Sequence, residues 1–213
     1  MYDALYLRFG PQNWWPGETP FEVMVGAVLT QNTNWKNVER AIANLKKADL
    51  LDPFAITECA PERLAEVIKP AGYYNVKARR LKNLVCVLAE DYEGDLEAFF
   101  SGDVDELRRR LASISGVGLE TADSIVLYAA GKPTFVVDAY TFRIVVRHGL
   151  LFPEAGYHEL KMLFEDNLPR DPQLYNEYHA LLVKVGKDFC RKRSPRCDGC
   201  PLEEFPHEVE EPF

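Results

Sequence analysis

A glycine-containing stretch at residues 114–122, Ile-Ser-Gly-Val-Gly-Leu-Glu-Thr-Ala, lies between two segments with helical periodicity. Before it, Leu107, Leu111 and Ile114 repeat at i, i+4 and i+7, and a second apolar stripe follows over residues 122–130. Two glycines one residue apart permit a tight turn and a close approach to a ligand. The restarting helix presents N–H groups that can bind a phosphate oxygen. A plain helical hairpin that needs glycine only to turn explains the same pattern, so both interpretations stand at this point.

Helical periodicity also dominates the rest of the chain. Apolar helical faces occur at residues 21–29, 35–45, 64–68, 77–91, 160–168 and 175–185. The run Phe-Val-Val at residues 135–137 is strand-like, but three residues are too few to establish a sheet. We therefore predict an all-α fold.

Length and charge limit the classes of protein that fit. The chain has 213 residues, 47% hydrophobic and 27% charged, which is typical of one globular domain or two small ones. No apolar run approaches the ~18 residues of a membrane span, and the start lacks a signal-peptide layout, so we expect a cytoplasmic protein without membrane contact. The net charge of -8 argues against a nucleic-acid partner, yet residues 187–196 hold five basic side chains and residues 203–211 hold five glutamates. Because of such an acidic tail, the net charge of the whole chain does not reveal a local basic surface.

Asp138 is the first candidate for chemistry. It follows the apolar run at 135–137 and precedes an expected helix from Ala139. A carboxylate held there can act as a general base or stabilise a developing cation. Aspartate is also a preferred N-cap residue, and the two roles are compatible.

Three cysteines near the C-terminus form a second candidate site. Cys190, Cys197 and Cys200 have the spacing C-x6-C-x2-C, with four basic residues interleaved. Without a signal peptide, clustered cysteines favour a metal over disulfides, and thiolates suit an iron–sulfur cluster or zinc. His207 is placed to complete a Cys3His set. The other two cysteines lie in apolar helical surroundings and are expected in the core.

All three tryptophans lie within 22 residues. Trp14 and Trp15 precede the first apolar helix, and Trp35 follows the polar run at 30–34. Aromatic side chains beside polar groups can stack a nucleobase. Packing in the core is the alternative, and for Trp35 the helical spacing favours it.

In this order, the motifs resemble those of the endonuclease III superfamily, the helix–hairpin–helix DNA glycosylases. Residues 114–122 look like the hairpin motif, Asp138 falls where the family has its catalytic aspartate, and the cysteines look like the opening of the C-terminal cluster loop. The likeness covers residues 20 to 200. It implies a barrel-like helical domain with the hairpin at 20–131, and a second helical domain of residues 1–19 plus 132–213 with the cysteine loop.

Two departures from the family pattern bear on activity. Glu120 stands where bifunctional members have a lysine, and a carboxylate cannot form a Schiff base, so the resemblance implies a monofunctional glycosylase without efficient AP-lyase activity. Pro206 stands where the fourth cysteine is expected. A 4Fe-4S cluster then needs another fourth ligand, such as His207, and zinc is the weaker alternative.

Within the superfamily, the 3-methyladenine DNA glycosylase III type is the nearest resemblance. It rests on residues 14–16, 29–33, 70–75, 118–123 and 136–138. The resemblance implies hydrolysis of the glycosidic bond of a flipped-out alkylated purine, with Asp138 stabilising the sugar cation and Glu120 ordering water. The implied base pocket comprises Trp14, Trp15, Trp35 and Lys187.

The same resemblance implies that a monomer binds double-stranded DNA containing damaged bases. The hairpin residues Gly116, Val117 and Gly118 are expected on the backbone, and Gln31 or Asn32 in the space that the base vacates. The expected phosphate contacts are Lys77, Arg191, Arg193 and Arg196. The same fold acting on mismatched uracil or thymine or on oxidised pyrimidines is an alternative, as are a non-catalytic DNA-damage binding module and a zinc-stabilised interaction domain.

Overall fold

The computed structural model describes residues 1–208, so the last two of the five C-terminal glutamates lie outside it. The chain divides into two compact units. We call residues 16–132 the hairpin unit, and residues 1–15 together with 133–208 the aspartate unit. The described residues form helices and no strand, so the all-α prediction is confirmed.

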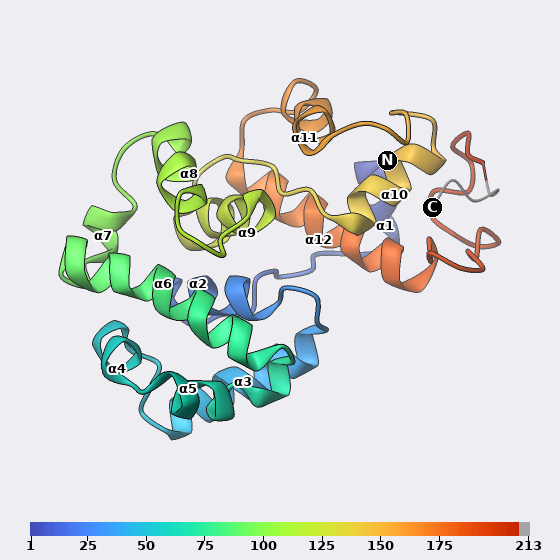
Figure 1. Ribbon diagram of the computed structural model, residues 1–213. Helices are drawn as coiled ribbons and strands as arrows, with labels where there is room; N and C mark the ends of the chain where they lie inside the picture. Colours follow the sequence, from blue (N-terminus) through green and yellow to red (C-terminus); the bar gives the residue numbers. More distant parts are fainter. Residues whose placement is uncertain (209–213) are drawn as a thin grey trace. The chain divides into compact units, whose positions relative to one another are not determined.

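The hairpin unit is built around two helices, α2 (Pro20–Leu29) and α6 (Tyr74–Tyr92). Every residue of α2 after its first proline is buried. Helices α4 and α5 pack along α6, as Figure 1 shows. The remaining elements are α3 (Trp35–Lys47), α4 (Pro53–Glu58), α5 (Pro61–Val67), the short η1 (Lys69–Ala71), α7 (Leu96–Phe99), α8 (Val104–Ala112), α9 (Leu119–Ser124) and the π-helical η2 (Ile125–Ala129).

The aspartate unit has four helices, with α12 (Pro172–Asp188) packed against α1 (Tyr2–Phe9) and α10 (Ala139–Arg147) (Figure 1). The fourth is α11 (Tyr157–Glu165). The run at 135–137 is extended and buried but pairs with no strand. Phe135 stacks on Phe164 with ring centroids 4.1 Å apart, and Tyr175 and Tyr178 meet it edge-on. Aromatic packing therefore holds the connector that leads to Asp138.

A charged pair on α11 fixes the same connector. Glu165 Oε1 accepts a hydrogen bond from the Phe135 backbone N–H at 2.7 Å and another from Lys161 Nζ at 2.6 Å. Lys161 also donates to the Thr134 hydroxyl. Both side chains are largely withdrawn from solvent, so each charge depends on these partners.

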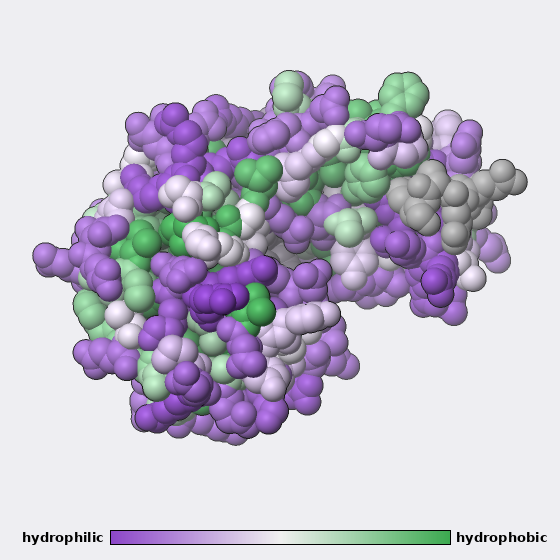
Figure 2. Space-filling view, viewed as in Figure 1, coloured by the Kyte–Doolittle hydropathy of each residue, from purple (hydrophilic) through white to green (hydrophobic). Residues whose placement is uncertain are grey.

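The surface view in Figure 2 is mostly hydrophilic, with scattered apolar patches. The most exposed large apolar side chains are Leu7 and Phe152, at 90% and 81%. Among residues 1–208, no helix combines the length and the apolar character needed to cross a bilayer.

We expect Glu165→Ala to lower the free energy of unfolding by about 2–4 kcal/mol, because it removes the carboxylate that balances the charge of Lys161 and accepts from the Phe135 N–H. Urea denaturation measures this change. The matched control is Glu66→Ala, which breaks an exposed pair with Lys69 and is expected to change stability little. Equal losses in the two variants would contradict this role of the α11 pair.

Candidate functional site

Asp138 is the N-cap of α10. Its Oδ1 accepts hydrogen bonds from the Thr141 backbone N–H at 2.8 Å and from the Thr141 hydroxyl at 3.0 Å. These two bonds hold one oxygen of the carboxylate and fix its orientation. The cap role and a chemical role are therefore geometrically compatible, as the sequence indicated.

The second carboxylate oxygen faces His179 of α12. His179 Nε2 lies 3.6 Å from Asp138 Oδ2, and the side chains are only 7% and 13% exposed. Burial raises the pKa of Asp138, but His179 and Thr141 lower it by more, so the pKa ends below its usual value. The carboxylate is thus ionised at neutral pH. Sequence reasoning missed His179, because nothing in the pattern of α12 links it to a residue 41 positions earlier.

Tyr140 is affected by the charge of Asp138 and contacts Gly186, Lys187 and Arg143. Gly186 packs so closely on Tyr140 that a Cβ there would be 2.7 Å from the ring, which explains the glycine. Lys187 Nζ lies 5.9 Å and Arg143 Cζ 5.2 Å from the centre of the Tyr140 ring, both within range of a cation–π contact. Burial, and the nearby Asp138 charge, raise the pKa of Tyr140. Lys187, a predicted pocket residue, is thus in contact range of Tyr140, which lies two positions after Asp138.

The three tryptophans fall into different units. Trp14 and Trp15 belong to the aspartate unit, are half-buried and meet edge-on with ring centroids 5.3 Å apart. Trp35 is also half-buried and begins α3 in the hairpin unit. All three keep part of their surface accessible, which a role in base binding requires.

The hairpin is formed by α8, a turn and α9. Gly116 has a φ of +98°, and a Cβ on it would lie 2.3 Å from Arg80 Cγ, so both its conformation and its surroundings require glycine. Val117 is buried, and Gly118 is the exposed N-cap of α9. Arg108 of α8 binds both carboxylate oxygens of the buried Asp123 on α9, at 2.6 and 3.2 Å, which locks the two helices together.

Gln31 is part of this turn. Its amide donates to the Gly116 carbonyl at 3.2 Å and to the Thr121 hydroxyl at 2.9 Å, and its oxygen accepts from Arg80. The structure thus gives Gln31 a supporting role under the hairpin. Asn32 is exposed with a φ of +53°, and Glu120 is exposed in the first turn of α9.

The structure corrects the expected place of Lys77. Its side chain is 2% exposed, and its ammonium donates to the carbonyls of Leu29 and Ala71 at 2.9 and 2.8 Å. Lys77 therefore ties the end of α2 to η1 inside the hairpin unit and is not on the surface, where a phosphate contact would have to be.

Arg191, Arg193 and Arg196 are exposed in the loop after α12. Their positions agree with the expectation of a local basic surface. Long cationic side chains that remain in solvent can bind phosphates without losing existing buried partners.

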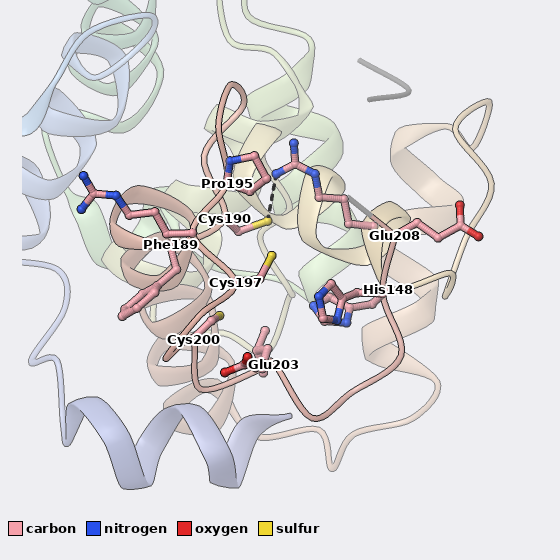
Figure 3. A pocket seen from close by; sticks show the side chains of 12 residues that line it. His148, Phe189, Cys190, Pro195, Cys197, Cys200, Glu203 and Glu208 are labelled. Atoms are coloured by element: carbon pink, nitrogen blue, oxygen red, sulfur yellow. Dashed lines mark hydrogen bonds between the residues drawn. The ribbon is translucent and has the colours of Figure 1, made fainter. Parts of the chain in front are cut away.

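The three predicted cysteines line one small cavity in this loop, and Figure 3 shows them side by side with His148 across from them. His207 lines the same cavity, with its ring 5.5 Å from that of His148. Burial, with the neighbouring thiols, raises the pKa of Cys197 and of Cys200.

Two arginines of α10 hold this loop. Arg147 donates to the carbonyls of Arg191 and Lys192 at 2.6 and 3.1 Å and to Cys190 Sγ at 3.3 Å. Arg143 donates to the Cys190 carbonyl at 2.7 Å. Sequence reasoning missed both arginines, because they lie more than 40 positions from the residues that they bind.

The candidate metal ligands that line this cavity include three thiols and two imidazole rings. Among residues 1–208, no three His, Cys, Asp or Glu side chains are placed to hold one metal ion. Around one zinc ion all ligands converge on a point, whereas each thiolate of a four-iron cluster binds a different iron atom. Three thiols line one cavity, one of their sulfurs accepts an N–H from Arg147, and the lining has no fourth cysteine.

Comparison with known proteins identifies the family. Residues 25–170 match the model of the HhH-GPD superfamily of base excision DNA repair proteins. The chain belongs to this superfamily, which confirms the helix–hairpin–helix glycosylase fold and the assignment to DNA glycosylases of base excision repair.

Similar proteins extend over nearly the whole chain. The protein MJ1434 of Methanocaldococcus jannaschii, which carries a provisional DNA repair glycosylase name, is 53% identical over 96% of this chain and 93% of its own. A thymine/uracil-DNA glycosylase of Pyrobaculum aerophilum is 28% identical over 92% of this chain and 84% of its own. The structure of the H. pylori 3-methyladenine DNA glycosylase MagIII, bound to 1,N6-ethenoadenine, superposes with a TM-score of 0.74 at 32% identity, covering 87% of this chain and 95% of that one.

The buried Lys77 predicts a pH-dependent stability. Burial, and the nearby Arg80 charge, lower its pKa to about 8 in the folded protein, whereas the pKa of lysine in an unfolded chain is about 10.4. Between these values the unfolded chain binds more protons, so stability rises with pH. From pH 8 to 9.5 we expect the wild type to gain about 1–2 kcal/mol relative to Lys77→Met, measured by urea denaturation.

The matched control is Lys36→Met, at an exposed position of α3. Its stability difference from the wild type is expected to stay constant over the same pH range. A constant difference for Lys77→Met as well would show that burial does not destabilise the charged form of Lys77.

Proposed function

We propose that this protein is a monofunctional DNA glycosylase that hydrolyses the N-glycosidic bond of a base turned out of the duplex. The observation that carries the proposal is Asp138, a buried and ionised carboxylate with one oxygen fixed by Thr141. A negative charge held rigidly in a site of low dielectric stabilises an oxocarbenium-like sugar cation. The second oxygen can orient or deprotonate the attacking water.

DNA binding in this proposal uses both units. The hairpin turn at Gly116, Val117 and Gly118 grips the backbone of the damaged strand, and the exposed Arg191, Arg193 and Arg196 bind phosphates. Asn32, exposed beside the supported Gln31, enters the space that the base vacates. Binding of this kind weakens as salt rises.

We propose an alkylated purine such as 3-methyladenine as the substrate. An N3- or N7-alkylated purine is already cationic and leaves without a strong general acid. Aromatic faces such as those of Trp14 and Trp15 favour a cationic base by ~0.5–2 kcal/mol, which discriminates against neutral adenine; Trp35 and Lys187 are proposed as further residues that contact the base. The likeness to MagIII at 32% identity supports this choice.

Uracil or thymine in a mismatch is the second candidate. The observation in its favour is the 28% identity to the thymine/uracil-DNA glycosylase of Pyrobaculum aerophilum, across 92% of this chain. The two candidates differ in the charge of the leaving base, so defined duplexes separate them.

Glu120 accounts for the absence of lyase chemistry in this proposal. Its exposed carboxylate stands where strand cleavage by the family needs an amine, and only an amine forms a Schiff base with the opened sugar. In this proposal Glu120 instead orders water or polar groups near the hairpin.

We also propose that Cys190, Cys197 and Cys200 hold a 4Fe-4S cluster, with His207 as the fourth ligand. His207 lines the same cavity, and its Nδ1 lies 2.8 Å from the Phe205 carbonyl, which leaves Nε2 as the ligating nitrogen. The cluster supplies structural cross-links to the loop that carries the three arginines.

Protein purified without oxygen is expected to contain iron and acid-labile sulfide, and Cys197→Ala is expected to lose most of both. Cys86→Ala, on α6 in the hairpin unit, is the matched control and is expected to keep the wild-type content. Zinc in place of iron, or equal content in the two variants, would contradict the cluster.

The proposed activity is tested by release of free base from duplexes containing 3-methyladenine, mismatched uracil or thymine, or oxidised pyrimidines, beside undamaged DNA. Methylated base is expected, with strand breaks only after alkali. Asp138→Asn is expected to lower the release rate at least about 100-fold while DNA binding survives, because the cation loses its counter-charge.

Other outcomes would redirect the proposal. Release of uracil or thymine alone would favour the second candidate, and strand breaks without alkali would contradict the role given to Glu120. Tight lesion binding without release of any base would indicate a damage-binding module.

A further inference from the structure

His179 is a buried histidine on α12 that the proposed reaction does not use directly. Its relative exposure is 6%, and its Nε2 faces Asp138 Oδ2 at 3.6 Å. The other oxygen of the carboxylate is occupied by two donors from Thr141. Asp138 is therefore flanked on two sides: a local cap binds one oxygen, and a ring from a distant helix faces the other.

We propose that His179 is a positioning residue that keeps the Asp138 carboxylate ionised and aimed at the reacting sugar. This inference rests on the proposed role of Asp138. A buried carboxylate loses the solvation that favours its charged form, and only nearby donors or positive charge can restore it. Thr141 supplies neutral donors, whereas an imidazole is a side chain that can carry a positive charge. His179 is thus the group placed beside Asp138 Oδ2 that can oppose the charge of the carboxylate.

The packed elements carry other charges that could produce a similar effect. These are Tyr140 and Arg143 of α10, Lys187 of α12, Lys161 and Glu165 of α11, and Asp3 of α1. Arg143 and Lys187 lie over the Tyr140 ring, and the α11 charges bind each other and the connector at 134–135. Asp3 acts on Tyr178. His179 is the residue whose ring nitrogen lies within ion-pair distance of Asp138.

The direct test is independent of activity. The pKa of the Asp138 carboxyl, measured by carbon-13 NMR, is expected to rise by about one pH unit in His179→Gln, since glutamine keeps a donor but carries no charge. His179→Leu, which removes the donor as well, is expected to raise it further. His158→Gln, at an exposed position of α11, is the matched control and leaves the Asp138 pKa unchanged. An unchanged Asp138 pKa in both His179 variants would overturn the proposal.

The kinetic test separates this role from a purely structural one. The acid limb of the pH–rate profile for base release is expected to move to higher pH in His179→Gln by the same amount, with the plateau rate within a few-fold of wild type. At a fixed pH below the limb, moving the limb up by about one pH unit lowers the rate about tenfold. A uniform loss of rate at every pH, with an unmoved limb, would mean that His179 only supports packing.

The two proposals fail in different ways. A raised Asp138 pKa in the His179 variants, with no base release from any duplex by the wild type, would contradict the proposed function and leave the electrostatic role of His179 standing. Base release by the wild type, with the same Asp138 pKa in every variant, would support the proposed function and contradict the electrostatic role of His179.

Discussion

Buried guanidinium groups on α10 constrain most of the aspartate unit. Arg143 and Arg147 each carry five N–H donors and no acceptor, so each needs acceptors wherever it is buried. They find them in the carbonyls of residues 186 and 190–192, which belong to the end of α12 and to the cysteine loop. The helix that begins at Asp138 therefore also holds the cysteine loop, and neither can move without breaking bonds of the other.

The connector before Asp138 is constrained in a complementary way. Its side chains pack against aromatic rings of α11 and α12, while its backbone bonds to the charged pair of α11. An extended segment without a strand partner would otherwise leave buried N–H groups unsatisfied. Asp138 is thus placed by contacts on both sides of it along the chain, which a site that must hold a charge within a fraction of an ångström requires.

The parts of the fold and site that could be predicted from the sequence are those with local causes. The hairpin turn, the cap at Asp138 and the cysteine spacing follow from glycine conformation, capping preference and ligand chemistry within short stretches. His179, Arg143 and Arg147 could not be predicted, because their partners lie about 40 positions away and their own helices look ordinary. The prediction for Lys77 was wrong for the same reason. A lysine on a helix is expected to be exposed to solvent, and only the packing of α2 and η1 supplies the two carbonyls that accept from its buried ammonium.

The support of the hairpin turn makes three distant positions dependent on one another. The stem of Arg80 lies in the space that Gly116 leaves by having no Cβ, and its guanidinium holds the Gln31 amide, which in turn binds the Gly116 carbonyl. A larger residue at 116 would displace Arg80 and release Gln31, so the cost of changing one position depends on the identity of the other two. We therefore expect residues 31, 80 and 116 to covary among related sequences.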